Sequence, residues 1–186
     1  VVPTGMDAAE AALDVGFPAV VKPVSLTASR GVMRVADPLA ARGAAQQARA
    51  LVPPWEPILV ERFVPGGEVA VEGLLDAGRF HPLAIFDKPD APQGPLFPAT
   101  MLVTPSDLAP QTQHRLVEDT AAVCSAIGLR HGPVHVEFRL GPDGAPTFLE
   151  LAARTIGGRC ATMLRFAGGC TLEELVLRQA LRLPFG

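Results

Sequence analysis

Hydrophobic and polar residues alternate in two neighbouring stretches, residues 134–140 (VHVEFRL) and residues 146–152 (PTFLELA). The Gly-Pro-Asp-Gly sequence between them favours a tight turn, so the pattern predicts two antiparallel strands joined as a hairpin. Alternation also sorts the side chains, because successive residues of a strand point to opposite faces of a sheet. One face is predicted to be apolar and the other charged. The apolar face carries Val134, Val136, Phe138, Leu149 and Leu151, and the charged face carries His135, Glu137, Arg139 and Glu150.

The predicted charged face brings two carboxylates close together. A turn centred on residues 142–143 makes Phe148 the partner of Glu137. In the same register His135 faces Glu150, so the two glutamates are diagonal neighbours about 7–8 Å apart. Mg²⁺ commonly takes one or two carboxylates together with substrate phosphates, which points to a magnesium-nucleotide site. A solvated sheet face, on which basic neighbours neutralise the glutamates, fits the same pattern.

The rest of the chain alternates helical and extended patterns, with a plausible subdomain boundary at residues 61–67. Residues 89–98 contain four prolines and no periodicity, so we expect a mobile loop there. Helices are predicted at residues 7–15, 38–51, 110–129 and 171–181, and further strands at residues 17–23, 32–35, 58–64, 68–75 and 79–86.

Composition narrows the class of protein. With 186 residues, of which 48% are hydrophobic and 19% charged, the chain forms one globular domain or two small ones. A net charge of -3 provides no basic surface for nucleic acid. There is no apolar run of about 18 residues, so a membrane span is not predicted. Cys124, Cys160 and Cys170 form neither a disulfide framework nor a zinc spacing, which favours a reducing, cytoplasmic location.

Lysine is rare in this chain, because only Lys22 and Lys88 are lysines among 16 basic residues. An ammonium group is a compact charge that often binds phosphate. Lys22 follows a short apolar run and precedes a small, polar loop at residues 24–31 (VSLTASRG), whose backbone amides could approach an anion closely. The loop is not a Walker loop, and a plain hairpin loop is an equally good interpretation.

Four groups of residues together resemble the ATP-grasp superfamily: residues 16–23 (GFPAVVKP), the loop after them, residues 61–64 (ERFV) with Glu68, and Glu137 with Glu150 and Arg154. Their order and spacing match over nearly the whole chain. Within the superfamily the chain most resembles carboxylate–amine ligases, including L-amino acid ligases, and next the biotin-carboxylase-like branch. The resemblance implies an α+β fold in which two subdomains, residues 1–64 and 65–186, sandwich the nucleotide between antiparallel sheets with packed helices.

The resemblance also implies residues that hold ATP. Lys22 would bind the nucleotide phosphates and take part in catalysis, and the loop would cover the β and γ phosphates through backbone amides. The segment at residues 61–64, called the hinge below, would contact adenine, and Glu68 would accept hydrogen bonds from the ribose hydroxyls. Lys88 would make a second contact with the nucleotide. The loop residues are Ser29, Arg30 and Gly31, and the hinge residues are Glu61, Arg62, Phe63 and Val64.

Metal and substrate residues follow from the same resemblance. Glu137 and Glu150 would ligate Mg²⁺, with Mn²⁺ as an alternative, and Arg154 would clamp an acyl-phosphate. An acceptor pocket would be lined by Gly157, Gly158 and Arg159. Each acidic or basic candidate also has a purely structural interpretation, such as a strand-end charge, a turn residue or a surface ion pair.

The chain departs from the family pattern in three places. Ala152 stands where many members have an asparagine that contacts metal, and Ala28 stands where a loop hydroxyl is often found. The N-terminal domain of the family is also absent from this chain. We therefore expect a fragment of a longer protein, which alone could be inactive.

The expected activity is an ATP-dependent ligase that joins a carboxylate to an amine through an acyl-phosphate and releases ADP and phosphate. Two alternatives stay open: carboxylation through carboxyphosphate, and a non-catalytic ATP-binding module. The expected partners are small-molecule carboxylates and amines, with no nucleic acid or membrane, and a homo-oligomer is an open possibility.

Overall fold

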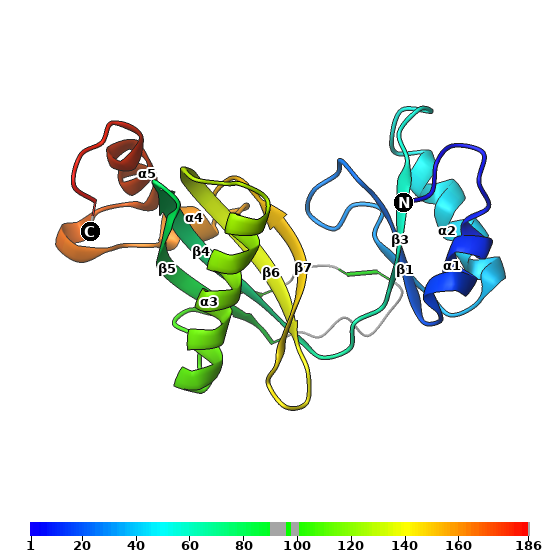
Figure 1. The fold of residues 1–186 in the computed structure, drawn as a ribbon, viewed down its shortest axis with the longest axis horizontal. Helices are drawn as coiled ribbons and strands as arrows, with labels where there is room; N and C mark the ends of the chain where they lie inside the picture. The colour runs from blue at the N-terminus through cyan, green and yellow to red at the C-terminus, as the bar shows by residue number, and fades with distance from the viewer. Residues whose placement is uncertain (90–95, 98–100, 186) are drawn as a thin grey trace. The chain divides into compact units, whose positions relative to one another are not determined.

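The chain forms two compact units in the computed structural model, which describes residues 1–89, 96–97 and 101–185 (Figure 1). The first unit contains Val1–Val64 together with Leu96 and Phe97, and the second contains the other described residues. Most of the predicted loop at residues 89–98 lies outside the described part of the chain.

The first unit is a three-stranded antiparallel sheet covered by two helices. Its strands are β1 (Ala19–Pro23), β2 (Met33–Val35) and β3 (Ile58–Arg62), in the order β2-β1-β3, and its helices are α1 (Ala8–Val15) and α2 (Pro38–Arg49). Asp7 caps α1 and Asp37 caps α2, each by accepting a backbone N–H. Small alanine side chains let both helices pack closely on one face of the sheet, around Val21, Ile58 and Val60. Lys22 and Glu61 alternate with these core residues and lie on the opposite face.

Leu96 and Phe97 belong to the first unit, although the sequence placed them in the second subdomain. Leu96 forms an antiparallel bridge with Met33, and the ring of Phe97 stacks on that of Phe63 at a centroid distance of 6.4 Å. Backbone pairing and aromatic stacking between segments far apart in the sequence explain this difference.

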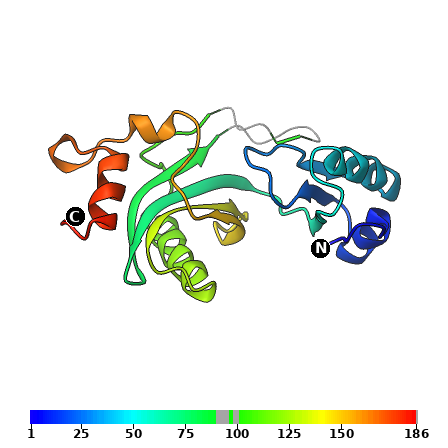
Figure 2. The same ribbon diagram turned by 90° about the horizontal axis from the view of Figure 1, so that it is seen from above.

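The second unit is a four-stranded antiparallel sheet in the order β5-β4-β6-β7. Figure 2 shows α3 on one side of this sheet and α4 on the other. Leu116 and Cys124 of α3 pack against Val71 and Val136, whereas Ile156 and Leu172 of the C-terminal segment pack against the opposite face. The elements are β4 (Gly67–Asp76), β5 (Arg79–Lys88), α3 (Pro110–Ala126), β6 (Gly132–Leu140), β7 (Pro146–Ala152), α4 (Cys160–Met163), the short 3-10 helix η1 (Ala167–Gly169) and α5 (Leu172–Ala180).

The β6–β7 hairpin is confirmed, but its predicted register is wrong. The turn is centred on residues 142–143 as expected, since the N–H of Gly144 donates to the carbonyl of Gly141 at 2.9 Å. Gly144 then adopts a φ of 72° and extends the loop, so Gly141 N–H donates to Ala145 instead. This moves the register by one residue.

A bulge between Glu137 and Phe138 moves the register by a second residue. Glu137 therefore pairs with Glu150, and not with Phe148. His135 pairs with Ala152, and not with Glu150. Because the side-chain period of a strand is two, the two shifts together leave Glu137 and Glu150 on the same face, as predicted.

Candidate functional site

One face of the second sheet carries rows of charged residues that pair across the strands. In the first row Glu68 of β4 lies between Lys88 and Arg139. The three rows together give this face four carboxylates, and the next two rows follow at the two-residue spacing of a strand. They are Phe86–Ala70–Glu137–Glu150 and Ala84–Glu72–His135–Ala152.

Ion pairs join these rows. Lys88 Nζ contacts Glu68 Oε1 and lies 2.7 Å from Glu137 Oε1. Arg139 Nη2 lies 2.8 Å from Glu68 Oε2, and its Nη1 donates to the carbonyl of Gly66 at 3.0 Å. His135 and Arg139 are only 7% and 5% exposed. The interpretation of this face as a solvated surface is therefore wrong, although its basic residues do neutralise the glutamates.

The surroundings of Glu137 keep its carboxyl group ionised. Burial alone would raise its pKa, but hydrogen bonds and positive charge from His135 and Lys88 outweigh burial and hold the pKa at about 2. Burial alone would lower the pKa of Lys88, yet the negative charges of Glu137 and Glu68 raise it. Glu137 and Lys88 are thus both charged at neutral pH.

Glu137 and Glu150 form the oxygen-rich part of this face. Directly paired residues have Cβ atoms about 4.5–5.5 Å apart, closer than the diagonal arrangement expected from the sequence. Glu150 is exposed, whereas the side chain of Glu137 is 20% exposed. Over the described part of the chain, no three or more His, Cys, Asp or Glu side chains gather as metal ligands. Two carboxylates suit Mg²⁺ when phosphate oxygens complete its shell.

The loop after β7 carries the predicted substrate residues. Arg154 is exposed, and its Nη1 donates to the carbonyl of Thr155 at 2.8 Å. Gly157, Gly158 and Arg159 are also exposed and lead into α4. Ile156 is buried between them and joins the core of the second unit. Ile156 therefore anchors this loop, whereas the predicted substrate residues on either side of it are exposed.

Lys22 and Glu61 form an ion pair in the first unit. Lys22 Nζ lies 2.7 Å from Glu61 Oε2, and their side chains are 16% and 41% exposed. Glu61 pairs with Val20 in the sheet, so Lys22 is its diagonal neighbour on the face opposite α1 and α2. The structure thus brings the predicted phosphate residue and the predicted hinge together.

The predicted phosphate loop is exposed at Ser29 and Arg30. The N–H of Arg30 donates to the carbonyl of Thr27 at 3.3 Å, and that of Val32 donates to Ser29 at 3.2 Å. Gly31 has a φ of +75°, and an added Cβ would lie 2.8 Å from Leu51 Cδ1. Glycine is therefore required where this loop meets its neighbours.

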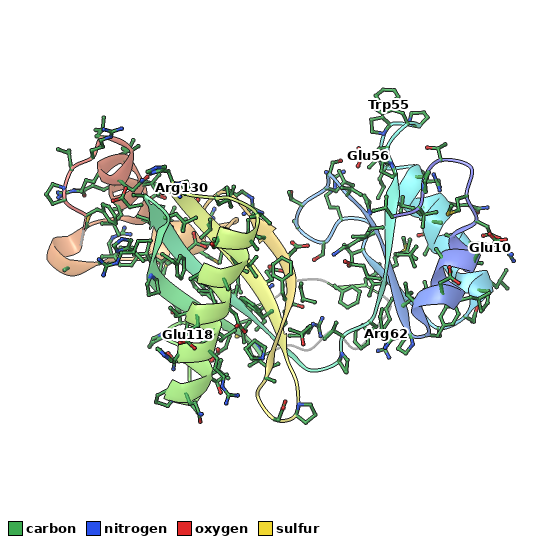
Figure 3. All side chains as sticks on the ribbon, in the orientation of Figure 1. Glu10, Trp55, Glu56, Arg62, Glu118 and Arg130 are labelled. Atoms are coloured by element: carbon green, nitrogen blue, oxygen red, sulfur yellow. The ribbon has the colours of Figure 1, made fainter. Side chains whose placement is uncertain are left out.

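The remaining hinge residues have structural contacts of their own. Arg62, labelled in Figure 3, donates from Nε to the carbonyl of Val15 at 2.9 Å. The N–H of Phe63 donates to the carbonyl of Pro18 at 2.9 Å. The guanidinium carbon of Arg34 lies 4.2 Å from the centroid of the Phe63 ring. Val64 is half-buried and ends the N-terminal segment of the first unit.

The chain matches the model of the ATP-grasp domain over residues 15–163. It belongs to the ATP-grasp family. Among curated proteins, it is 26% identical over 185 residues to alanine–anticapsin ligase of Bacillus subtilis (strain 168), a match that covers 88% of this chain and 39% of that protein.

Solved structures agree with the family. The ATP-grasp chain is similar to an L-amino acid ligase from Bacillus licheniformis, with a TM-score of 0.72, 32% identity, and coverage of 92% of this chain and 41% of that one. It also shares its fold with the biotin carboxylase domain of a Hydrogenobacter thermophilus 2-oxoglutarate carboxylase, solved with MgADP and bicarbonate. The TM-score is 0.73 at 18% identity, and the match covers 94% of this chain and 38% of that one. The ATP-grasp chain thus spans about two fifths of the length of these proteins. None of the helices that the structure describes is both long and apolar enough to span a membrane.

The predicted site residues of the ATP-grasp chain divide between its two units. Lys22, the phosphate loop and the hinge lie in the first unit, and the other predicted residues lie in the second. Within the second, Lys88 contacts both Glu68 and Glu137 directly.

Sequence reasoning missed Glu72 as a site residue. Its side chain is fully buried and contacts His135, which the sequence placed on the charged face. The signal was present in the sequence, because Glu72 follows Glu68 at a spacing of four and so shares its strand face. Arg139 was assigned to the right face, but its pairing with Glu68 depends on strand β4 lying beside β6.

Proposed function

We propose that this ATP-grasp chain is the nucleotide-binding part of an ATP-dependent ligase that joins a carboxylate to an amine. The carboxylate would attack the γ phosphate and release ADP, and the amine would then displace phosphate from the acyl-phosphate. The direct pairing of Glu137 with Glu150 on one sheet face carries this proposal. The 32% identity to the Bacillus licheniformis L-amino acid ligase supports the same class of reaction.

Neutralisation of negative charge is the main task of this site, since a carboxylate and a triphosphate must approach each other. Lys22 would hold phosphate oxygens, and its ion pair with Glu61 orients its ammonium group. Arg154 is exposed and would offer a planar donor pair to the acyl-phosphate. Glu137 and Glu150 would hold Mg²⁺, or Mn²⁺ in its place, and the bound ion would polarise phosphoryl oxygens.

Lys88 and His135 prepare Glu137 for this role. Their hydrogen bonds to Oε1 keep its carboxylate ionised and oriented at neutral pH, the state in which a carboxylate can ligate a cation. The exposed loop at residues 24–31 would cover the phosphates and keep water from hydrolysing the acyl-phosphate.

Compartment and partners complete the proposal. Cys124, Cys160 and Cys170 are free thiols, which supports a cytoplasmic location. The substrates would be a small carboxylate and a small amine, and self-association of the protein would be tested by its mass in solution.

The test measures ATP binding with and without Mg²⁺, followed by phosphate release over a panel of carboxylates and amines with product masses. We expect Mg²⁺-dependent binding and phosphate release that requires both substrates. Bicarbonate-dependent ADP release would favour carboxylation instead, and the carboxylase domain that shares the fold was solved with MgADP and bicarbonate. Binding without turnover on any substrate would favour a non-catalytic module.

A further inference from the structure

Glu72 is a fully buried carboxylate at the middle of β4. Burial of a charged group is costly unless hydrogen bonds satisfy it. Both oxygens of Glu72 are used: Oε1 accepts the backbone N–H of Ile156 at 2.9 Å, and Oε2 lies 3.1 Å from Nδ1 of His135. Glu72 thus joins the central sheet to the loop that follows β7.

His135 continues the connection from Glu72 to the candidate metal ligand. Its Nε2 lies 3.2 Å from Oε1 of Glu137, so one imidazole bridges two carboxylates. His135 is itself only 7% exposed, and it pairs directly with Glu72 across the strands. The pairing of strands β4 and β6 therefore fixes the positions of the His135 ring and of the Glu72 and Glu137 carboxylates.

The other end of the connection is the backbone of the loop that bears Arg154. Ile156 is 5% exposed and is packed in the core, whereas Arg154 and Gly157 beside it are exposed. The hydrogen bond from the N–H of Ile156 to Glu72 is a polar link between this loop and β4. A movement of Glu72 would shift Arg154 relative to Glu137.

We propose that Glu72 is a positioning residue that, through His135 and Ile156, holds Arg154 and Glu137 in a fixed mutual geometry. This inference rests on the proposed ligase function for its effect on turnover. Because Glu72 is fully buried, it acts through groups that face the nucleotide and substrate rather than by touching them itself. The raised pKa of Glu72, caused first by burial, agrees with its isolation from water.

Two substitutions at Glu72 separate positioning from simple stability. Gln keeps an oxygen for the Ile156 N–H and an amide for His135, whereas Met has a similar size and removes both bonds. Thr120→Val is the matched control, because Thr120 is fully buried on α3 and its Oγ1 donates to Leu116 at 2.7 Å, against the other face of the sheet. All three variants change a buried polar group in the same unit.

The first readout is amide hydrogen exchange, which needs no turnover. In Glu72→Met the exchange rate of the Ile156 amide should rise by about tenfold or more, as expected for loss of a hydrogen bond to a charged group. In Glu72→Gln and Thr120→Val it should stay within about threefold of the wild type. An Ile156 amide that is no faster in Glu72→Met than in Thr120→Val overturns the proposal.

The second readout is steady-state phosphate release. Glu72→Met should lower kcat by about tenfold or more while the Kd for ATP stays within about threefold, and Glu72→Gln should retain most of kcat. Equal loss of kcat in the Gln and Met variants overturns the proposal. If the wild-type protein shows neither ATP binding nor phosphate release, the proposed function fails, whereas the exchange experiment still decides the link to Ile156.

His135→Gln serves if Glu72→Met does not fold. It removes the bridge to Glu137 and leaves the bond between Glu72 and Ile156 in place. We expect a lower kcat with Ile156 exchange within about threefold of the wild type. An unchanged kcat in this variant overturns the proposed connection.

Discussion

Lys88 Nζ on β5 lies 2.7 Å from Glu137 Oε1 on β6, reaching across the intervening strand β4, where it also contacts Glu68. The side chain of Lys88 is 11% exposed, so this ammonium group holds two nearby carboxylates together in a largely buried site. Loss of Lys88 removes an ion-pair partner from both carboxylates, and leaves Glu68 with Arg139 and Glu137 with His135 in this largely buried site.

Replacement of Lys88 by Met should therefore destabilise the second unit strongly, by about 3–5 kcal/mol. The free energy of unfolding from denaturant titration measures the effect. Arg178→Met is the control, because Arg178 pairs with Glu174 at the surface of α5 and its loss should change stability little. If the two variants lose similar amounts of unfolding free energy, the ion pairs of Lys88 stabilise the protein no more than a surface pair does.

The stability of the protein should depend on the ionisation of Glu137. Its pKa is about 2 in the folded state against 4.5 for a free glutamate, so the native state binds the proton less readily than the unfolded chain. A carboxylate of this kind stabilises the fold fully above its unfolded pKa, and the contribution disappears as the pH falls through its folded pKa. The full contribution is on the order of 3 kcal/mol.

The experiment compares wild type with Glu137→Gln in EDTA across this range. The difference in unfolding free energy should be largest above about pH 5 and should shrink toward pH 2. Glu10→Gln, on the exposed face of α1, is the control. A wild-type advantage that does not change with pH would contradict the ion pairs as its source.

Glu150 should be required for magnesium-dependent nucleotide binding. Replacement by Ala leaves Glu137 as the single carboxylate of the pair, so we expect Mg²⁺-dependent ATP binding and turnover to be lost. Isothermal titration with and without Mg²⁺ measures this loss. Glu118→Ala is the control, because the side chain of Glu118 on α3 is 63% exposed (Figure 3). Unchanged binding in Glu150→Ala would reject the metal assignment.

Lys22 should contribute to ATP affinity through the shape of its ammonium group. Lys22→Ala should weaken ATP binding by about tenfold or more, and Lys22→Arg should restore it only in part, because a guanidinium is planar and larger. Arg42→Ala removes an exposed surface pair with Asp7 and should leave ATP affinity unchanged. Full affinity in Lys22→Arg would show that charge alone is sufficient.

Local patterns predicted the elements of this chain well. The predicted final helix is confirmed as Leu172–Ala180, where the Oγ1 of Thr171 accepts the N–H of Glu174. The first helix begins after its N-cap residue Asp7 and ends before its C-cap residue Gly16, which are also local signals. Capping and strand alternation act within a few residues, so they can be read from the chain directly.

The sequence by itself determined that Glu137 and Glu150 share one face of a hairpin, because alternation has a period of two and survives a shift of two residues. Only the tertiary structure decided that they are direct partners, since the longer turn and the bulge between Glu137 and Phe138 together set the register of the hairpin. Burial of Glu72 likewise required β4 to lie beside β6 and the C-terminal segment to cover that face. Such contacts join residues far apart in the chain, and no local pattern specifies them.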